Sequence, residues 1–293
     1  MPRKRFLLGI DSDGTVFDSM VIKHRRVFQP VAIDLWNLNA IELAYCALAE
    51  TINLFSLHRG INRFAGLAII FRRLAEQTDE GGTLLQGQED LEDFVASGEP
   101  LSHAALASYN RSRKSAFLEK VLEWSRRCDA LYSEIMEEEG NPVFPYVHDS
   151  LGRASERADI VVISSSSRMT LEHDWKRAGL FSLVKTIEGQ EHGSKTCQLK
   201  GVLEAGYENN CALMLGDALS DLESAREHDI LFYPIKPGAE KESWERFFVE
   251  ALPRFFDGGY GGEYERKLLK EFQKVLVSDG DPQAMTRSVF QNS

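Results

Sequence analysis

A short apolar segment, Phe6–Ile10, runs directly into two acidic residues, Asp11 and Asp13, and then into Gly14 and Thr15. Side chains at positions i and i+2 of a strand share a face, so both carboxylates point to one spot where the segment ends. Open α/β sheets bind their ligands at the carboxyl ends of the strands. Two like charges this close are costly unless a cation neutralises them or one carboxyl group holds a proton. The segment therefore predicts a strand that ends in a metal-dependent active site.

Three further segments of this kind follow in order along the chain. The β-branched run Ile160–Ile163, typical of a buried parallel strand, ends in a serine. A lysine then lies in a Gly-Ser-Lys-Thr stretch before an expected helix, and the apolar run Ala212–Leu215 leads into Gly-Asp-Ala-Leu-Ser-Asp. We expect the polar residues of these segments to gather at one edge of a sheet. They are Ser164, Lys195, Asp217 and Asp221.

In this order, the four segments resemble the four motifs of the haloacid dehalogenase (HAD) superfamily. The resemblance covers residues 5–19 and about 158–235. It implies an α/β fold whose core is a Rossmann-like, doubly wound parallel sheet, with an all-helical cap domain of the C1 type inserted after the first strand. It also implies a hydrolase that acts on phosphoric monoesters with Mg²⁺.

The first two acids suit two different chemical roles. An ionised carboxylate at Asp11 can attack phosphorus and form an aspartyl-phosphate, which divides one difficult displacement into two easier ones. Asp13 would protonate the leaving group and then, as general base, activate a water molecule. In the superfamily, the backbone carbonyl at the position of Asp13 contacts the metal ion, rather than the carboxylate.

The carboxylates together predict a magnesium site. Mg²⁺ takes hard oxygen ligands, keeps part of its water shell and bridges substrate phosphates. Asp217 is expected to be a further direct ligand of the ion. Asp221, one helical turn later in the chain, would support a direct ligand or contact the ion through a water molecule. Taken alone, Asp221 is equally explained as a first-turn acid that complements a helix dipole. The expected metal-binding residues are Asp11, Asp13, Asp217 and Asp221.

The serine and the lysine would contact the transferred phosphoryl group. Ser164 would donate a hydrogen bond to a phosphoryl oxygen, although a serine after a strand is more often a helix cap. Ser165, beside it, is a second candidate for binding the substrate. Lys195 would neutralise the paired aspartate and phosphate and so act as a catalytic residue with Asp11. Lys200 is an alternative for this role, but Lys195 directly precedes the expected helix.

Basic residues of the inserted segment could also reach a substrate. Lys23 and His24 enter the cap directly after the first motif, and we take them as substrate-binding candidates. Arg59 and Arg63 lie one helical turn apart and could serve similarly. A basic residue on a helix face is more often simply solvated.

The long interval between the first two strands divides the chain. Residues 1–19 and 143–257 would form the HAD-like α/β core, and residues 20–142 the helical cap. Residues 258–293 would form a C-terminal helix and a polar tail. A cap of this kind excludes water from the catalytic centre and selects the substrate.

Helical periodicity dominates the insertion. Residues 33–57 read as helical, and a long helix is expected over residues 115–139. Residues 76–100, rich in Gly, Gln, Asp and Glu, would be a loop with a short helix at 89–95. The insertion is larger than a typical four-helix cap, and the added length could reshape the pocket or mediate oligomerisation.

Composition limits the partners and the setting. The 293 residues carry a formal net charge of −11, which argues against nucleic acid or an anionic membrane as the main partner. The most membrane-like stretch, residues 64–71, is bracketed by arginines and too short to span a bilayer. The four cysteines stand singly, which favours reduced thiols in a cytoplasmic protein.

These observations favour a Mg²⁺-dependent phosphatase that hydrolyses a small phosphorylated metabolite. A phosphomutase-type phosphotransferase, which passes the aspartyl-phosphate to a sugar, is the main alternative. A dehalogenase would lack the second acid, whereas Asp13 is present. A phosphonate hydrolase would need a cap lysine such as Lys23 for a Schiff base. A non-catalytic protein on the same scaffold would be expected to have lost a motif acid.

Overall fold

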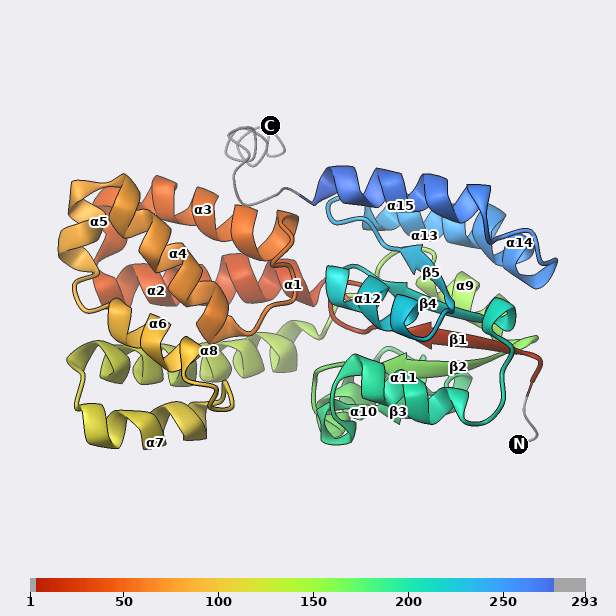
Figure 1. Ribbon diagram of the computed structural model, residues 1–293, viewed down its shortest axis with the longest axis horizontal. Coiled ribbons are helices and arrows are strands. Elements are labelled where there is room, and N and C mark those ends of the chain that lie inside the picture. The colour runs from red at the N-terminus through yellow and green to blue at the C-terminus, as the bar shows by residue number, and fades with distance from the viewer. Residues whose placement is uncertain (1–3, 277–293) are drawn as a thin grey trace. The chain divides into compact units, whose positions relative to one another are not determined.

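The computed structural model describes residues 4–276, which form two compact units (Figure 1). The sheet unit comprises residues 4–20 and Glu139–Leu276, and the helical unit comprises Val21–Glu138. Each unit buries its own set of apolar side chains. Among the helices described, none is both long and apolar enough to cross a membrane.

The sheet unit is built on one parallel sheet of five strands in the order β3-β2-β1-β4-β5. From the central strand β1 the chain adds strands on one side and then returns to add strands on the other. This reversal places a topological switch point beside β1, where ligands of doubly wound sheets bind. The doubly wound parallel sheet predicted from the sequence is therefore confirmed. The strands are β1 (Phe6–Ile10), β2 (Ala158–Ile163), β3 (Thr186–Glu188), β4 (Ala212–Gly216) and β5 (Leu231–Pro234).

Alternate side chains of each strand enter two different cores. Leu8 and Ile10 of β1 pack in one core, and Leu7 packs in the other. Helices α9, α10, α13 and α14 supply the first core, α11 and α12 supply the second, and α15 contributes to both. Burial on both faces explains why β1, β2, β4 and β5 are apolar at nearly every position. The helices are α9 (Val147–Ser155), α10 (Arg168–Arg177), α11 (Lys195–Leu203), α12 (Leu219–Glu227), α13 (Glu240–Arg246), α14 (Leu252–Phe256) and α15 (Glu263–Val275), with a π-helical turn η6 (Phe247–Ala251) before α14.

Helix α15, which lies in the C-terminal segment expected from residue 258, packs as part of the sheet unit. Phe272 of α15 is fully buried in the core that contains Phe232 of β5. The Tyr260 hydroxyl donates to the Phe232 carbonyl at 2.7 Å, and Glu265 accepts the Phe232 N–H at 2.8 Å. These bonds join the segment to an edge strand. The expected polar tail lies outside the described residues from position 277 on.

The helical unit has an aromatic core of its own. Trp36 packs edge-on against Phe71, which in turn packs edge-on against Phe117. A short helix α1 (Ser19–Val21) leads into the unit. The remaining elements are η1 (Ile22–Phe28, π-helical), α2 (Gln29–Trp36), η2 (Leu38–Ile41), α3 (Glu42–Phe55), α4 (Arg63–Gln77), α5 (Asp79–Leu84), α6 (Glu89–Ala96), α7 (His103–Arg113) and α8 (Ala116–Glu139).

Two expectations for the insertion need correction. The helical region 33–57 is divided at Asn37, whose left-handed conformation (φ 54°) ends α2. The expected loop 76–100 contains an additional helix, α5, capped by the Thr78 side chain. The glycine that suggested a loop there serves close packing, since a Cβ at Gly81 would lie 2.4 Å from the Leu74 carbonyl oxygen.

Candidate active site

The carboxyl ends of β1, β2 and β4 lie side by side. Ile10 of β1 pairs in register with Val162 of β2 and with Leu215 of β4. The next residue, Asp11, donates its backbone N–H to the Leu215 carbonyl at 3.0 Å. Because parallel strands in register end at the same edge, the residues that follow β2 and β4 emerge near Asp11.

Three buried carboxylates meet at this edge. One side-chain oxygen each from Asp11, Asp217 and Asp221 lies within 4.8 Å of the other two. These residues expose only 5%, 2% and 0% of their surface. Gly216 permits the approach, since a Cβ there would lie 2.3 Å from the Asp221 Cβ. Within residues 4–276, no other group of three His, Cys, Asp or Glu side chains comes close enough to share a metal ion.

Lys195 enters this cluster from the first turn of α11. Its Nζ lies 2.9 Å from Oδ1 of Asp11 and 2.6 Å from Oδ1 of Asp221. The Ser194 side chain caps α11 by accepting a backbone N–H of its first turn. The alternative lysine, Lys200, is exposed further along the same helix. Lys195 is therefore the lysine that contacts Asp11.

Burial and crowding change the ionisation of the cluster. Burial raises the pKa of Asp11 well above its usual value, and the nearby carboxylates of Asp221 and Asp217 raise it further against the effect of Lys195. Burial also raises the pKa of Asp221. Burial opposes a charge on Lys195, but the two adjacent carboxylates outweigh it and raise the pKa of the ammonium group. Lys195 stays charged, and its single charge faces three carboxylates.

This donor set fits a magnesium ion. Carboxylate oxygens are the hard ligands that Mg²⁺ prefers, and a divalent cation would balance the charge that Lys195 leaves uncompensated. The Thr15 hydroxyl donates to Oδ1 of Asp217 at 2.7 Å and orients that carboxylate. The second oxygen of Asp221 accepts a backbone N–H at the start of α12 at 3.1 Å. Asp11 and Asp217 are thus the acids best placed to hold the ion, with Asp221 turned toward Lys195.

Asp13 has different partners from the other motif acids. Gly14 turns the chain directly after it with a φ of 76°, in the left-handed region that favours glycine. The hydroxyls of Ser19 and Ser166 donate to the two oxygens of its carboxylate, Ser166 at 2.8 Å. Since hydroxyls both donate and accept, they can serve Asp13 in either protonation state. The Asp13 carboxylate lies outside the three-acid group, and a metal contact through its backbone oxygen stays a prediction.

The four consecutive serines after β2 have four separate environments. Ser164 is buried, and its Oγ accepts the N–H of Ser166 at 3.2 Å. Ser165 is exposed, Ser166 contacts Asp13, and Ser167 caps α10. The contact of Ser166 could not be found from the sequence, because nothing in the pattern distinguishes it from its neighbours.

Two buried indole groups hold the loop of the first motif. Trp175 donates its Nε1–H to the hydroxyl of Ser12 at 3.1 Å, and Trp244 donates to the Thr15 carbonyl at 2.8 Å. Neither contact could be predicted from the sequence, because a tryptophan in an amphipathic helix predicts only core packing. Thr15 was also missed, although its place in the Asp-x-Asp-Gly-Thr segment was a signal.

The basic candidates of the insertion lie in the helical unit. The Lys23 Nζ lies 5.1 Å from the centre of the Tyr132 ring. His24 is buried, and this burial, together with the charges of Arg59, Lys23 and Arg63, lowers the pKa of His24 to about 3. His24 is therefore neutral near pH 7. The part of Lys23 and His24 in substrate binding stays a prediction.

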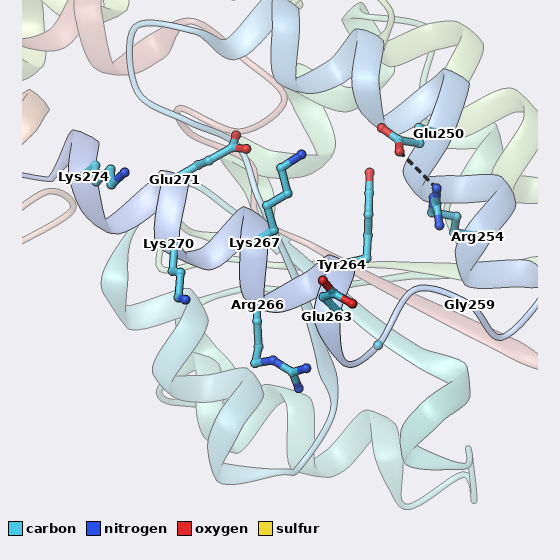
Figure 2. A pocket seen from close by; sticks show the side chains of 11 residues that line it. Glu250, Arg254, Gly259, Glu263, Tyr264, Arg266, Lys267, Lys270, Glu271 and Lys274 are labelled. Atoms are coloured by element: carbon cyan, nitrogen blue, oxygen red, sulfur yellow. Dashed lines mark ion pairs between the residues drawn. The ribbon is translucent and has the colours of Figure 1, made fainter.

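A cavity of about 820 Å³ elsewhere in the sheet unit is not the site (Figure 2). It lies between α15 and the segment of η6 and α14, and an ion pair of Glu250 with Arg254 at 3.3 Å lines one side. Lys267 and Tyr264 extend toward that side, whereas Arg266 extends away from it. None of the motif residues lines this cavity. The candidate site is therefore identified by its cluster of charged side chains and not by the size of a cavity.

No protein-family model and no curated protein matches the chain. Solved structures do resemble it. A haloacid dehalogenase-like hydrolase from Streptococcus pneumoniae has 16% identity and a TM-score of 0.42, over 82% of this chain and 90% of that chain. A predicted phosphoglycolate phosphatase from Haemophilus somnus has 13% identity and a TM-score of 0.47, over 80% and 86%. A protein assigned as a HAD-hydrolase from Bacillus subtilis, bound to magnesium, has 14% identity and a TM-score of 0.43, over 79% and 86%.

Proposed function

We propose that this protein is a Mg²⁺-dependent phosphatase of the HAD superfamily, which hydrolyses a small phosphorylated metabolite through an aspartyl-phosphate. The observation that carries the proposal is the contact of Lys195 with Asp11 at 2.9 Å, at the carboxyl end of the central strand. A buried carboxylate with a permanent cation beside it can accept a phosphoryl group, because the cation offsets charge that builds up during the transfer.

In the first half-reaction, an oxygen of Asp11 attacks the phosphorus of the substrate. The new oxygen–phosphorus bond forms as the bond to the leaving oxygen breaks, and Asp13 gives its proton to that oxygen. The hydroxyls of Ser19 and Ser166 hold the Asp13 carboxyl in position. Ser164 and the adjacent Ser165 are proposed to donate hydrogen bonds to the phosphoryl oxygens.

In the second half-reaction, water attacks the phosphorus of the aspartyl-phosphate. Asp13, now ionised, takes a proton from this water, and the bond between phosphorus and the Asp11 oxygen breaks. Inorganic phosphate leaves and Asp13 is again protonated. Lys195 stays beside Asp11 in both steps and stabilises the charge on the transferred group.

The magnesium ion would be held by Asp11, by the backbone oxygen of Asp13 and by Asp217. Asp221 would support these ligands or contact the ion through a water molecule. When bound, Mg²⁺ supplies positive charge to the phosphoryl oxygens and orients them for in-line displacement. Thr15 keeps the Asp217 carboxylate turned toward the cluster.

Recognition of the rest of the substrate is assigned to the helical unit. Lys23 and His24 are the proposed contacts. Arg59 and Arg63 are further candidates for contacts with anionic groups of the substrate, and Arg63 also pairs with Asp129 at 2.6 Å. A small phosphorylated metabolite suits the acidic chain, whose net charge of −11 requires the attraction to be local.

The test is phosphate release from a panel of phosphorylated sugars, nucleotides and glycolytic acids, with Mg²⁺ and with a chelator. Asp11→Asn should abolish turnover, and Asp149→Asn, an exposed acid on α9, should leave it intact. Three results would count against the proposal: turnover without metal, full activity of Asp11→Asn, and no phosphate release from any compound of the panel. A phosphorylated sugar product formed faster than free phosphate would instead identify a phosphotransferase.

A further inference from the structure

Gln198 lies buried on α11, three residues after Lys195, and uses its whole amide group in hydrogen bonds. Its surface is 2% exposed. Its Oε1 accepts the backbone N–H of Ser164 at 3.0 Å. Its Nε2 faces three backbone carbonyls, those of Ser164 at 3.0 Å, Gly189 at 3.0 Å and Gly193 at 2.9 Å. Two N–H groups are thus shared among three acceptors.

The orientation of this amide is fixed by its surroundings. A rotated amide would place its NH₂ group against the N–H of Ser164 and its oxygen against three carbonyl oxygens. Both contacts would be repulsive, so one orientation satisfies the site. A buried amide in this position cannot be exchanged for an apolar side chain without leaving backbone groups unpaired.

The bonds join two segments that both lead to catalytic candidates. Ser164 directly follows β2, and Gly193 lies two residues before Lys195. Residues 190–194, which connect β3 to α11, are all exposed and contribute no buried side chain of their own. Gln198 is the buried side chain that joins this connection to the end of β2. Two bonds at its exposed part add to this: the Gln190 N–H donates to the Ser166 carbonyl at 3.0 Å, and the Glu191 carboxylate accepts the Arg168 N–H at 3.1 Å.

We propose that Gln198 is a positioning residue, which sets the distance between Ser164 and Lys195 across the candidate phosphoryl site. The inference rests on the proposed function, because the two residues it positions are assigned there. The hydrogen bonds of the Gln198 side chain go to Ser164, Gly189 and Gly193, and not to Asp11. Its effect is on geometry, and a misplacement of about 1 Å at a catalytic group can lower a rate about 100-fold.

Gln198→Glu is the most informative variant. The glutamate keeps the size of the side chain and an oxygen that accepts the Ser164 N–H, but it removes both N–H donors of the amide. We expect kcat to fall about 10- to 100-fold with a change in KM of less than about 3-fold. Hydrogen exchange should accelerate at least about tenfold in residues 189–195, with that of β4 unchanged. Gln190→Glu makes the same chemical change at an exposed position of the same connection and should leave both measurements near wild type.

The measurements separate a positioning role from simple stabilisation. If Gln198→Glu lowers the melting temperature but leaves kcat per folded molecule unchanged, the inference fails. Unchanged exchange in residues 189–195 would also overturn it. If the wild-type protein shows no phosphatase activity that depends on Asp11, the proposed function fails instead, and the exchange rates alone decide whether Gln198 fixes the connection.

Discussion

Lys195 and Asp221 form an ion pair of 2.6 Å in which the aspartate has no exposed surface. They come from the first turns of two helices, α11 and α12, which pack on the same face of the sheet. The same ammonium group contacts Asp11 at 2.9 Å. One cation thus connects the candidate nucleophile to the candidate metal site, so a change at any of the three groups should affect the other two.

Lys195→Gln should damage both stability and turnover. Breaking a buried ion pair costs about 3–5 kcal/mol, because it leaves the partner carboxylate uncompensated. Loss of the charge beside the phosphoryl group should lower kcat about 100- to 1000-fold. Chemical denaturation and steady-state kinetics measure the two effects. Lys176→Gln breaks an exposed pair with Glu172 and should cost less than about 1 kcal/mol. Equal losses in the two variants would contradict the assignment.

Asp11→Asn should inactivate the protein and yet stabilise its metal-free form at neutral pH. The pKa of Asp11 is raised by burial and by neighbouring carboxylates. Its contribution to stability is therefore full below the unfolded pKa and is lost as the pH rises through the folded pKa. Asparagine has no ionisable carboxyl group, so the variant does not lose this stability as the pH rises. Melting curves in a chelator across pH 4–8 should show a smaller decline for the variant than for wild type, and parallel curves would argue against the buried charge.

Mg²⁺ should stabilise the protein through Asp217. A ligand at 100 times its Kd stabilises the folded state by about 2.7 kcal/mol. Thermal melting with increasing Mg²⁺ should show this rise in wild type and lose it in Asp217→Asn. Thr15→Val keeps the shape but removes the hydrogen bond to Asp217, and should weaken the apparent affinity about 10- to 100-fold. An unchanged Mg²⁺ titration in Asp217→Asn would show that the ion binds elsewhere.

His24 should make stability depend on pH. Burial and nearby cations lower the pKa of His24 to about 3, from an ordinary value of 6.5. The unfolded chain therefore binds more protons between these values, and stability falls as the pH drops from 6.5 toward 3. The full effect is about 4–5 kcal/mol. Denaturation of His24→Gln should show a flatter profile over this range, whereas the exposed His148→Gln should retain the wild-type slope.

Local sequence patterns predicted β1, β2 and β4, because each of these buried parallel strands is a short apolar run that ends beside a polar or glycine residue. Strand β3 was not among them, since its three residues Thr186–Glu188 are too short and too polar to form such a run. The helix break at Asn37 and the additional helix α5 were also missed, because both depend on single backbone conformations. The attachment of α15 depends on contacts with β5 that no local pattern reveals.

The sequence by itself determined the fold class and singled out the candidate acids, serine and lysine, since each follows a strand or begins a helix and their order defines the motifs. Only the tertiary structure decided which groups touch. It brought Lys195 rather than Lys200 to Asp11, gave Asp13 the hydroxyl of Ser166, and buried Gln198 against two connections. Contacts of this kind arise from strand register and helix packing, which place residues separated by more than 200 positions within hydrogen-bond distance, as Thr15 and Asp217 show.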